Sequence, residues 1–309
     1  MNFEGLSEKL TGFNQYYESD LRERLEELEA RRKIAQSHFT LASIAVVIIG
    51  IVIFAIMKDD VPFQAIFIVG GLILAFLGQR VSIVKKEAKL SVLPIICDHL
   101  EFVYSSGPRH NLLQKFENLS LVPDYNRENR EDEISGTLTD VDFWLQEAKL
   151  VQVSGSVKNR TSRTVFKGLL CHFDFHKNFK GTTIGREDFT SFGNFFSGFT
   201  TVGERVRLED PEFENKFEVY STDQVEARHL LTPGFMQRVL DLLRLSQIKH
   251  VQFAFDDGKF YMAIESPKKF FEGGDFNLNE PEYVQNIIND IALVFDVVKT
   301  LNLTQVTKI

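Results

Sequence analysis

Two long uncharged runs near the start of the chain dominate its pattern of hydrophobic and polar positions. Phe39–Met57 reads FTLASIAVVIIGIVIFAIM, Val61–Gly78 reads VPFQAIFIVGGLILAFLG, and Lys58-Asp59-Asp60 separates the two. A helix rises about 1.5 Å per residue, so the first run would be roughly 28 Å long, close to the ~30 Å hydrocarbon core of a bilayer. We predict a hairpin of two transmembrane helices that contact the lipid bilayer. The alternative, a hairpin buried in a water-soluble core, rarely accommodates two such runs.

Basic residues flank this hairpin on both outer sides. Lys and Arg near the ends of a span favour the cytosolic side, so both flanks, and with them both chain ends, are predicted to be cytosolic. Neither run contains an ionisable residue, which argues against an ion pathway or a transporter. The basic residues are Arg31, Arg32 and Lys33 before the first run, and Arg80, Lys85, Lys86 and Lys89 after the second.

Residues 1–37 form a polar, helix-prone segment ahead of the hairpin at 38–79. Leu21, Leu25 and Leu28 follow a 4-then-3 spacing that places them on one helical face. A coiled coil needs more sustained heptads, so we predict a cytosolic helix that packs on the cytosolic domain.

Residues 80–309 alternate between strand and helix signals. A helix interrupted at Pro94 is expected first, and the polar stretch 126–133 reads as a loop. Asp257-Gly258, between two alternating segments, predicts a hairpin with a type I′ turn, and Thr232-Pro233 predicts a helix start. Further strands are expected at 141–145, 150–153, 165–175, 206–208 and 217–220, with a closing helix from about Pro281 to Leu301. The fold class is therefore α+β, with a mainly antiparallel sheet and appended helices.

Charge and cysteine usage exclude some classes of partner. The chain has 35 Lys and Arg against 43 Asp and Glu, a net charge of −8, so nucleic acid is not expected as a partner. Its two cysteines, Cys97 and Cys171, lie far apart and are expected to be reduced cytosolic thiols.

Three segments resemble a known protein family. They are FKGLLCHFDFHKNFKGTTI (166–184), RVRLEDPEFENKFEVYSTDQVEARHLLTP (205–233) and GKFYMAIE (258–265). They are similar to a bacterial membrane protein family, domain of unknown function 3137, and the resemblance covers roughly residues 80–300. It implies two spans ahead of a cytosolic domain, in the bacterial cytoplasmic membrane. The family carries no established activity, cofactor or catalytic residue.

One strand carries candidate metal ligands. His172, Asp174 and His176 alternate, so their side chains share one face of the strand. Imidazole and carboxylate bind divalent metals, but neighbours two apart on one strand diverge unless another strand contributes a ligand. We interpret the three as a solvent-facing strand surface, with a metal site as the alternative.

A phenylalanine-rich segment is a second candidate. Phe189, Phe192, Phe195, Phe196 and Phe199 lie in DFTSFGNFFSGF among Ser, Thr and Gly. They are expected to pack on the core of the domain, and the alternative is an exposed surface that contacts a partner or the membrane.

No motif in the sequence specifies catalysis. GxSxG, HExxH and CxxC are absent, and GTTIG at 181–185 matches neither the phosphate loop nor GxGxxG. We therefore predict a membrane-tethered scaffold or interaction module without a cofactor or a recognisable small-molecule site. The alternative is a membrane-bound enzyme of unrecognised type, such as a metal-dependent hydrolase that uses His172, Asp174 and His176.

Overall fold

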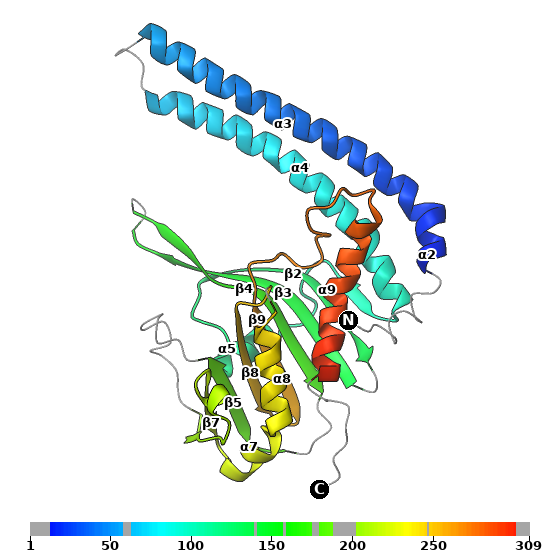
Figure 1. Cartoon of the computed structure of the whole chain (residues 1–309). Helices are drawn as coiled ribbons and strands as arrows, with labels where there is room; N and C mark the ends of the chain where they lie inside the picture. The colour runs from blue at the N-terminus through cyan, green and yellow to red at the C-terminus, as the bar shows by residue number, and fades with distance from the viewer. Residues whose placement is uncertain are drawn as a thin grey trace. The chain divides into compact units, whose positions relative to one another are not determined.

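The computed structural model of the chain divides into two compact units (Figure 1). The first contains Cys97–Phe270 and the chain from Asn289 onward, and the second contains Glu4–Ile96 together with Phe271–Ile288. The structure describes residues 13–57, 63–138, 141–156, 159–174, 179–187, 202–245 and 247–300.

Long helices build most of the second unit. Helix α2 (Phe13–Tyr16), the π-helical turn η1 (Tyr17–Leu21) and α3 (Arg22–Met57) follow one another without a break. Helix α4 (Phe63–His99) continues through Pro94, so the predicted interruption there is wrong. Both α3 and α4 are long and apolar enough to cross a membrane.

Contacts along their length show that α3 and α4 run antiparallel. Arg31 Nη1 lies 3.1 Å from Glu87 Oε1 at one end. Farther along, a Cβ atom placed on Gly70 would lie only 2.7 Å from Val46 Cγ1, so the two backbones approach closely there. At Gly71 the same test finds no atom within 4 Å.

A segment from the far end of the sequence completes the second unit through buried charges. Glu29, with a side chain 3% exposed, pairs with Arg32 at 2.8 Å and accepts a hydrogen bond from the backbone N–H of Leu278. Arg32 also donates to the side chain of Asn277, and Lys89 Nζ lies 2.9 Å from Glu272 Oε1. Buried charges are stable only when they are paired in this way.

The described strands form one nine-stranded antiparallel sheet in the order β1-β2-β3-β4-β9-β8-β5-β7-β6. The strands are β1 (Val103–Ser105), β2 (Arg127–Leu138), β3 (Val141–Ser154), β4 (Thr161–Asp174), β5 (Thr182–Glu187), β6 (Glu204–Val206), β7 (Phe217–Ser221), β8 (His250–Asp256) and β9 (Lys259–Glu265). The helices between them are α5 (Leu113–Asn118), α6 (Pro211–Glu214), α7 (Gln224–Leu230) and α8 (Pro233–Leu243). The chain is therefore α+β, as predicted.

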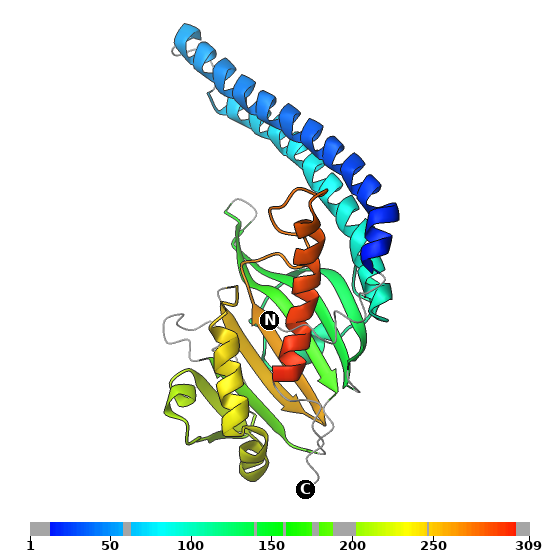
Figure 2. The ribbon, with the colours of Figure 1, turned by 45° about the vertical axis from the view of Figure 1, so that its right-hand side comes forward.

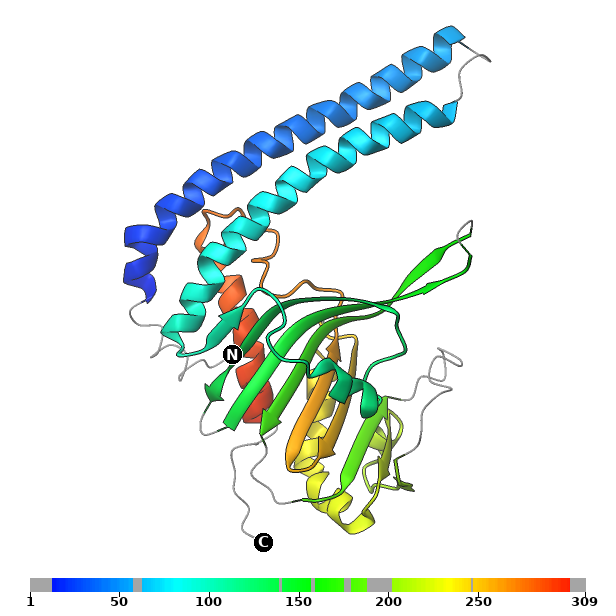
Figure 3. The same ribbon diagram turned by 180° about the vertical axis from the view of Figure 1, so that it is seen from behind.

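Helices cover both faces of the sheet. Helix α8 lies along β8 and β9 (Figure 2). There the ring centroid of Phe235 lies 5.4–5.9 Å from the ring centroids of Phe253, Phe255 and Phe260. The short helix α5 lies on the opposite face (Figure 3), where Phe116 packs against Trp144 and Tyr261. Many of the abundant phenylalanines thus form the core under α8.

Local signals correctly placed several elements. Thr232 Oγ1 accepts a hydrogen bond from the N–H of Phe235 and caps α8. Asp257 and Gly258 have φ values of 48° and 73°, as the predicted type I′ turn requires, and they join β8 to β9. Helix α9 (Pro281–Thr300) begins at the predicted proline; its residues up to Ile288 belong to the second unit and those from Asn289 to the first.

Other predictions about elements were wrong. Residues 127–133, expected in a loop, belong to β2. The two strands expected at 141–145 and 150–153 are the single strand β3.

Candidate functional site

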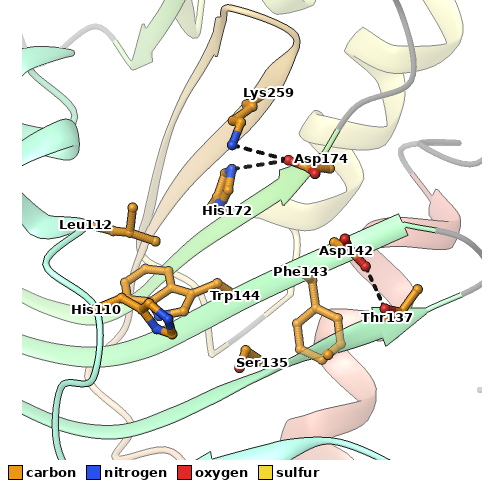
Figure 4. Close-up of a pocket in the computed structure, with 11 residues that line it drawn as sticks. His110, Leu112, Ser135, Thr137, Asp142, Phe143, Trp144, His172, Asp174 and Lys259 are labelled. Atoms are coloured by element: carbon orange, nitrogen blue, oxygen red, sulfur yellow. Dashed lines mark hydrogen bonds and ion pairs between the residues drawn. The ribbon is translucent and has the colours of Figure 1, made fainter.

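An open cleft of about 410 Å³ lies on the α5 face, where β2 and β4 end and β3 and β9 begin (Figure 4). The register of the strands explains which side chains meet there. Ser135 pairs with Trp144, Trp144 with His172, and His172 with Tyr261, so these four form one row across the sheet. The residues that line the cleft are His110, Leu112, Ser135, Gly136, Thr137, Asp142, Phe143, Trp144, His172, Asp174 and Lys259.

A second row of polar side chains forms the rim of the cleft. Thr137 pairs with Asp142, and Asp174 pairs with Lys259. Asp142 precedes Phe143 and Asp174 follows Phe173, so on these antiparallel strands both carboxylates lie one residue beyond the Phe143–Phe173 pair, on the same side of it.

Each of these two carboxylates has a nearby partner. Thr137 donates to Asp142 at 2.5 Å, and Lys259 Nζ lies 3.5 Å from Asp174 Oδ1 (Figure 4). Lys259 and Asp174 are both 45% exposed, so their attraction adds little to stability. The rim therefore presents two carboxylates and one ammonium group to solvent.

His172 is held as a neutral imidazole in the floor of the cleft. Its side chain is only 13% exposed and stacks on Tyr261 with ring centroids 4.9 Å apart. Burial, helped by the cations of Lys259 and Lys115 and opposed by the carboxylate of Asp174, lowers the pKa of His172 to about 4. In the row expected to face solvent, Asp174 is thus exposed and His172 is largely buried.

The proposed metal ligands are brought together only in part. His172 Nε2 lies 3.8 Å from Asp174 Oδ1, and His176 is outside the described residues. Within the described part of the chain, no three His, Cys, Asp or Glu side chains are grouped so that they could hold a metal ion. The phenylalanine-rich segment, Phe189–Phe199, also lies outside the described residues.

A buried carboxylate orients a second histidine at the cleft. The side chain of Glu133, 1% exposed, accepts hydrogen bonds from the backbone N–H groups of Arg109 and His110 and lies 2.6 Å from His110 Nδ1. The imidazole of His110 is 53% exposed, so its other nitrogen is directed to the cleft side or to solvent. A carboxylate that fixes one ring nitrogen of a histidine recurs in catalytic and binding sites.

Sequence reasoning missed the pair of His110 and Glu133. The two residues are 23 positions apart, and Glu133 fell in a stretch that was interpreted as a loop. The only available signal was alternation: Glu133, Ser135 and Thr137 occupy every second position of β2 and so share one face.

The floor also contains two buried nitrogen atoms that lack a hydrogen-bond partner among the described residues. Trp144 Nε1 and His172 Nε2 make no hydrogen bond to the described residues, although both atoms are inaccessible to solvent. Unpaired buried polar groups are unfavourable by about 1–3 kcal/mol each. This part of the sheet is therefore not optimised for stability alone.

The acidic residues between Asp210 and Glu226 have structural roles. Asp210 caps α6 by accepting from the N–H groups of Glu212 and Phe213, and Asp223 caps α7 in the same way. Glu214 accepts from the backbone of Leu208, and Glu226 accepts from the N–H groups of Lys180 and Gly181. These contacts give the acidic residues of the LEDPEF and STDQVEAR motifs structural roles, so a catalytic role is not needed to explain why the residues are acidic.

These motifs, together with β4 and the β8–β9 hairpin, lie in the part of the chain that relates it to other proteins. Residues 164–303 match the family model "Protein of unknown function (DUF3137)". The resemblance seen in the sequence is thereby confirmed over this range. Within the DUF3137 region lie His172, Asp174 and Lys259 of the cleft, whereas His110, Glu133 and Trp144 precede it.

Other comparisons add a structural likeness. No curated protein matches the chain. The chain is similar to the crystal structure of the mycobacterial trehalose monomycolate transport factor A, TtfA, with 11% sequence identity and a TM-score of 0.33. The match covers 70% of this chain and 93% of that one.

Proposed function

We propose that this protein is anchored in the bacterial cytoplasmic membrane by α3 and α4 and that its β-sheet unit is a cytosolic interaction module. The exposure of the apolar helices carries the proposal. In the most apolar stretch of α3, 0% of the residues are buried. In the corresponding stretch of α4, 11% of the residues are buried. Leu41, Val47 and Leu72 are 60–66% exposed, which a core helix of a soluble protein would not allow. A bilayer would cover these side chains.

The distribution of basic residues supports cytosolic ends. Arg32 and Lys89 are buried in ion pairs, so they do not face lipid headgroups. Arg31, Lys33, Arg80 and Lys86 are exposed at the same ends of the helices. The Arg80 guanidinium lies 5.4 Å from the ring centroid of Phe76, a position that suits an arginine whose charge reaches the membrane interface.

Topology reporters test this proposal directly. Reporters fused after Lys33 and after Ile309 should both read as cytosolic, and a reporter at Asp59 should read as external. The membrane fraction should retain the full chain after alkaline carbonate extraction. An external C-terminal reporter, or release by carbonate, would contradict the proposed anchoring.

The phenylalanine-rich segment is expected to pack on the core of the domain, and the alternative is a contact surface for a partner or the membrane. If Phe192 and Phe195 are core residues, replacing either with Ala should lower the free energy of unfolding by about 3–5 kcal/mol. If they form a contact surface, both variants should fold normally and bind liposomes or partners less well. Thermal melting and liposome binding of the full chain, measured on the same preparations, separate the two roles.

A membrane-bound enzyme is the second candidate, and the pair of Glu133 and His110 favours it. In this function His110 would act as a general base or acid, and Glu133 would fix the ring. A metal-dependent hydrolase would instead use His172, Asp174 and His176. We expect no hydrolysis of generic ester and phosphate substrates and no stoichiometric metal. Turnover that His110→Ala abolishes, or one metal per chain that His172→Ala with His176→Ala removes, would favour the enzyme.

A further inference from the structure

The hairpin of β3 and β4 extends beyond the rest of the sheet (Figures 1 and 3). Strand β2 pairs with β3 only as far as Val151, and β9 pairs with β4 only from Gly168 onward. Among the described residues, 152–154 of β3 and 161–163 of β4 therefore pair only with each other. We call these strand ends, together with the described residues 155, 156, 159 and 160 between them, the ribbon. A two-stranded ribbon gains little from core packing, so packing does not dictate its sequence.

The base of the ribbon is fixed to the sheet. Asn126 Nδ2 donates to the carbonyl oxygen of Val153 at 2.7 Å, and the N–H of Val153 donates to Asn126 Oδ1 at 2.9 Å. The backbone N–H of Asn126 also donates to the carbonyl oxygen of Val151. These bonds keep the ribbon aligned with β3.

The ribbon is basic in a chain that is acidic. No Asp or Glu occurs from Ala148 to Phe173, whereas the whole chain has a net charge of −8. Lys149, Arg160 and Arg163 are exposed, and so is Arg127, beside the base of the ribbon. Lys158 adds a further positive charge in the sequence.

The carboxylate of Glu128, on β2 beside the base of the ribbon, is already paired. Glu128, which pairs in register with Leu150, lies 3.0 Å from Arg130 Nη2 and accepts a hydrogen bond from Tyr125. The remaining exposed side chains of the ribbon are small and polar, since Ser154, Gly155, Ser156, Thr161 and Ser162 are all exposed. Small neighbours leave the long Arg and Lys side chains accessible to a flat surface.

We infer that the ribbon binds the anionic headgroup surface of the bilayer that anchors the chain. The inference rests on the proposed function, because anchoring keeps the surface at a high effective concentration. Each basic residue near an anionic leaflet strengthens association about fivefold, so a few weak contacts suffice for a tethered domain. The acidic remainder of the unit is repelled by the same surface, so the ribbon would determine which side of the unit approaches it.

Full-length protein in nanodiscs provides the test. Ser156→Cys places an environment-sensitive fluorophore on the exposed ribbon, and the native Cys97 and Cys171 are buried and should not compete for the label. We expect a headgroup-like signal in discs of equal parts phosphatidylcholine and phosphatidylglycerol, and none in pure phosphatidylcholine. Raising the salt concentration should abolish the signal, because salt screens exposed charges.

Charge-matched variants make the test specific. Arg160→Ser with Arg163→Ser should shift the equilibrium from bound to free ribbon by more than tenfold. The control, Arg207→Ser with Arg228→Ser, removes the same charge from exposed positions outside the ribbon and should leave the signal unchanged.

The outcomes separate this inference from the proposed anchoring. If the chain resists carbonate extraction but the label does not respond to phosphatidylglycerol, the inference is wrong and the proposed anchoring still holds. A response to an added oligonucleotide or acidic peptide, but not to the lipid, also overturns it. A chain that fails to insert into the bilayer overturns both.

Discussion

Several buried charged side chains in this protein share one arrangement, in which a carboxylate holds a backbone N–H and a basic or imidazole group together. Glu29 does so with Leu278 and Arg32, and Glu133 does so with Arg109 and His110. A buried carboxylate needs several donors because it has lost its hydration. These residues therefore fix the positions of loops that contribute little to the hydrophobic core.

Removing one partner of the buried pair in the second unit should be strongly destabilising. Glu29→Ala leaves the Arg32 guanidinium, 9% exposed, without its main carboxylate partner, and we expect a loss of about 3–5 kcal/mol in the free energy of unfolding. Glu18 and Arg22 form a matched exposed pair at 2.8 Å, and Glu18→Ala should change stability by less than about 0.5 kcal/mol. Thermal melting of both variants in detergent measures the difference. Equal losses would contradict the structural role assigned to Glu29.

His172 should make stability depend on pH. Its pKa is lowered from 6.5 to about 4 in the folded chain, so between these values the unfolded chain binds more protons. The free energy of unfolding should therefore fall as the pH is lowered through this window, by at most about 3 kcal/mol.

A variant at the same position provides the control for this pH dependence. His172→Gln cannot titrate, so its stability should fall less than that of the wild-type chain between about pH 6.5 and 4. Melting temperatures measured across this range check the difference. Parallel curves for the two proteins would show that His172 is not buried as a neutral group.

At the scale of elements, the glycine at position 70 determines how closely α3 and α4 approach. Gly70→Leu would insert a side chain where a Cβ already lies 2.7 Å from Val46, so we expect the helices to separate and stability to fall by about 1–3 kcal/mol. Gly71→Leu is the matched control, because no atom lies within 4 Å of its Cβ position. Cross-linking of Phe39→Cys with Gly78→Cys, compared in the two backgrounds, reports the separation directly. Similar cross-linking in both would contradict this packing.

Elements with local signals could be predicted, and those that depend on distant partners could not. The Asp257-Gly258 turn and the Thr232 cap are encoded in adjacent residues. Strand β2 was missed because six of its first seven residues are charged and because a bulge at Asp132, with φ of 48°, interrupts its alternation. The side chain of Asp132 is buried and accepts a hydrogen bond from Tyr104, so β1 stabilises the bulge.

The candidate site was predictable to the same limited extent. The alternation of His172 and Asp174 was visible in the sequence. Their meeting with Trp144 and Lys259 depends on the registers of β3 and β9 with β4. Register between strands far apart in sequence is set by the whole sheet, and a single sequence does not reveal it.

At the scale of the whole molecule, a segment late in the sequence and the long apolar helices belong to one unit. Phe271–Ile288 is grouped with Glu4–Ile96. A fragment that starts at Cys97 should therefore keep the sheet but lose the partners of Glu272, Asn277 and Leu278. Hydrogen exchange should show lower protection in 271–288 than in the full chain and unchanged protection in β8 and β9. Equal protection of 271–288 in both proteins would contradict this grouping.

The two ends of the strand order limit how a partner protein could be recognised. Among the described strands, the outermost are β1 and β6, with three residues each, so these two strands expose few unpaired backbone N–H and C=O groups. Extended peptides often bind by adding a strand to a long open edge, which supplies affinity through the backbone and tolerates many sequences. Strands as short as β1 and β6 provide almost no template for this mode, and they also limit edge-to-edge aggregation. A partner that bound at β1 or β6 would therefore be recognised through its side chains and selected for its sequence.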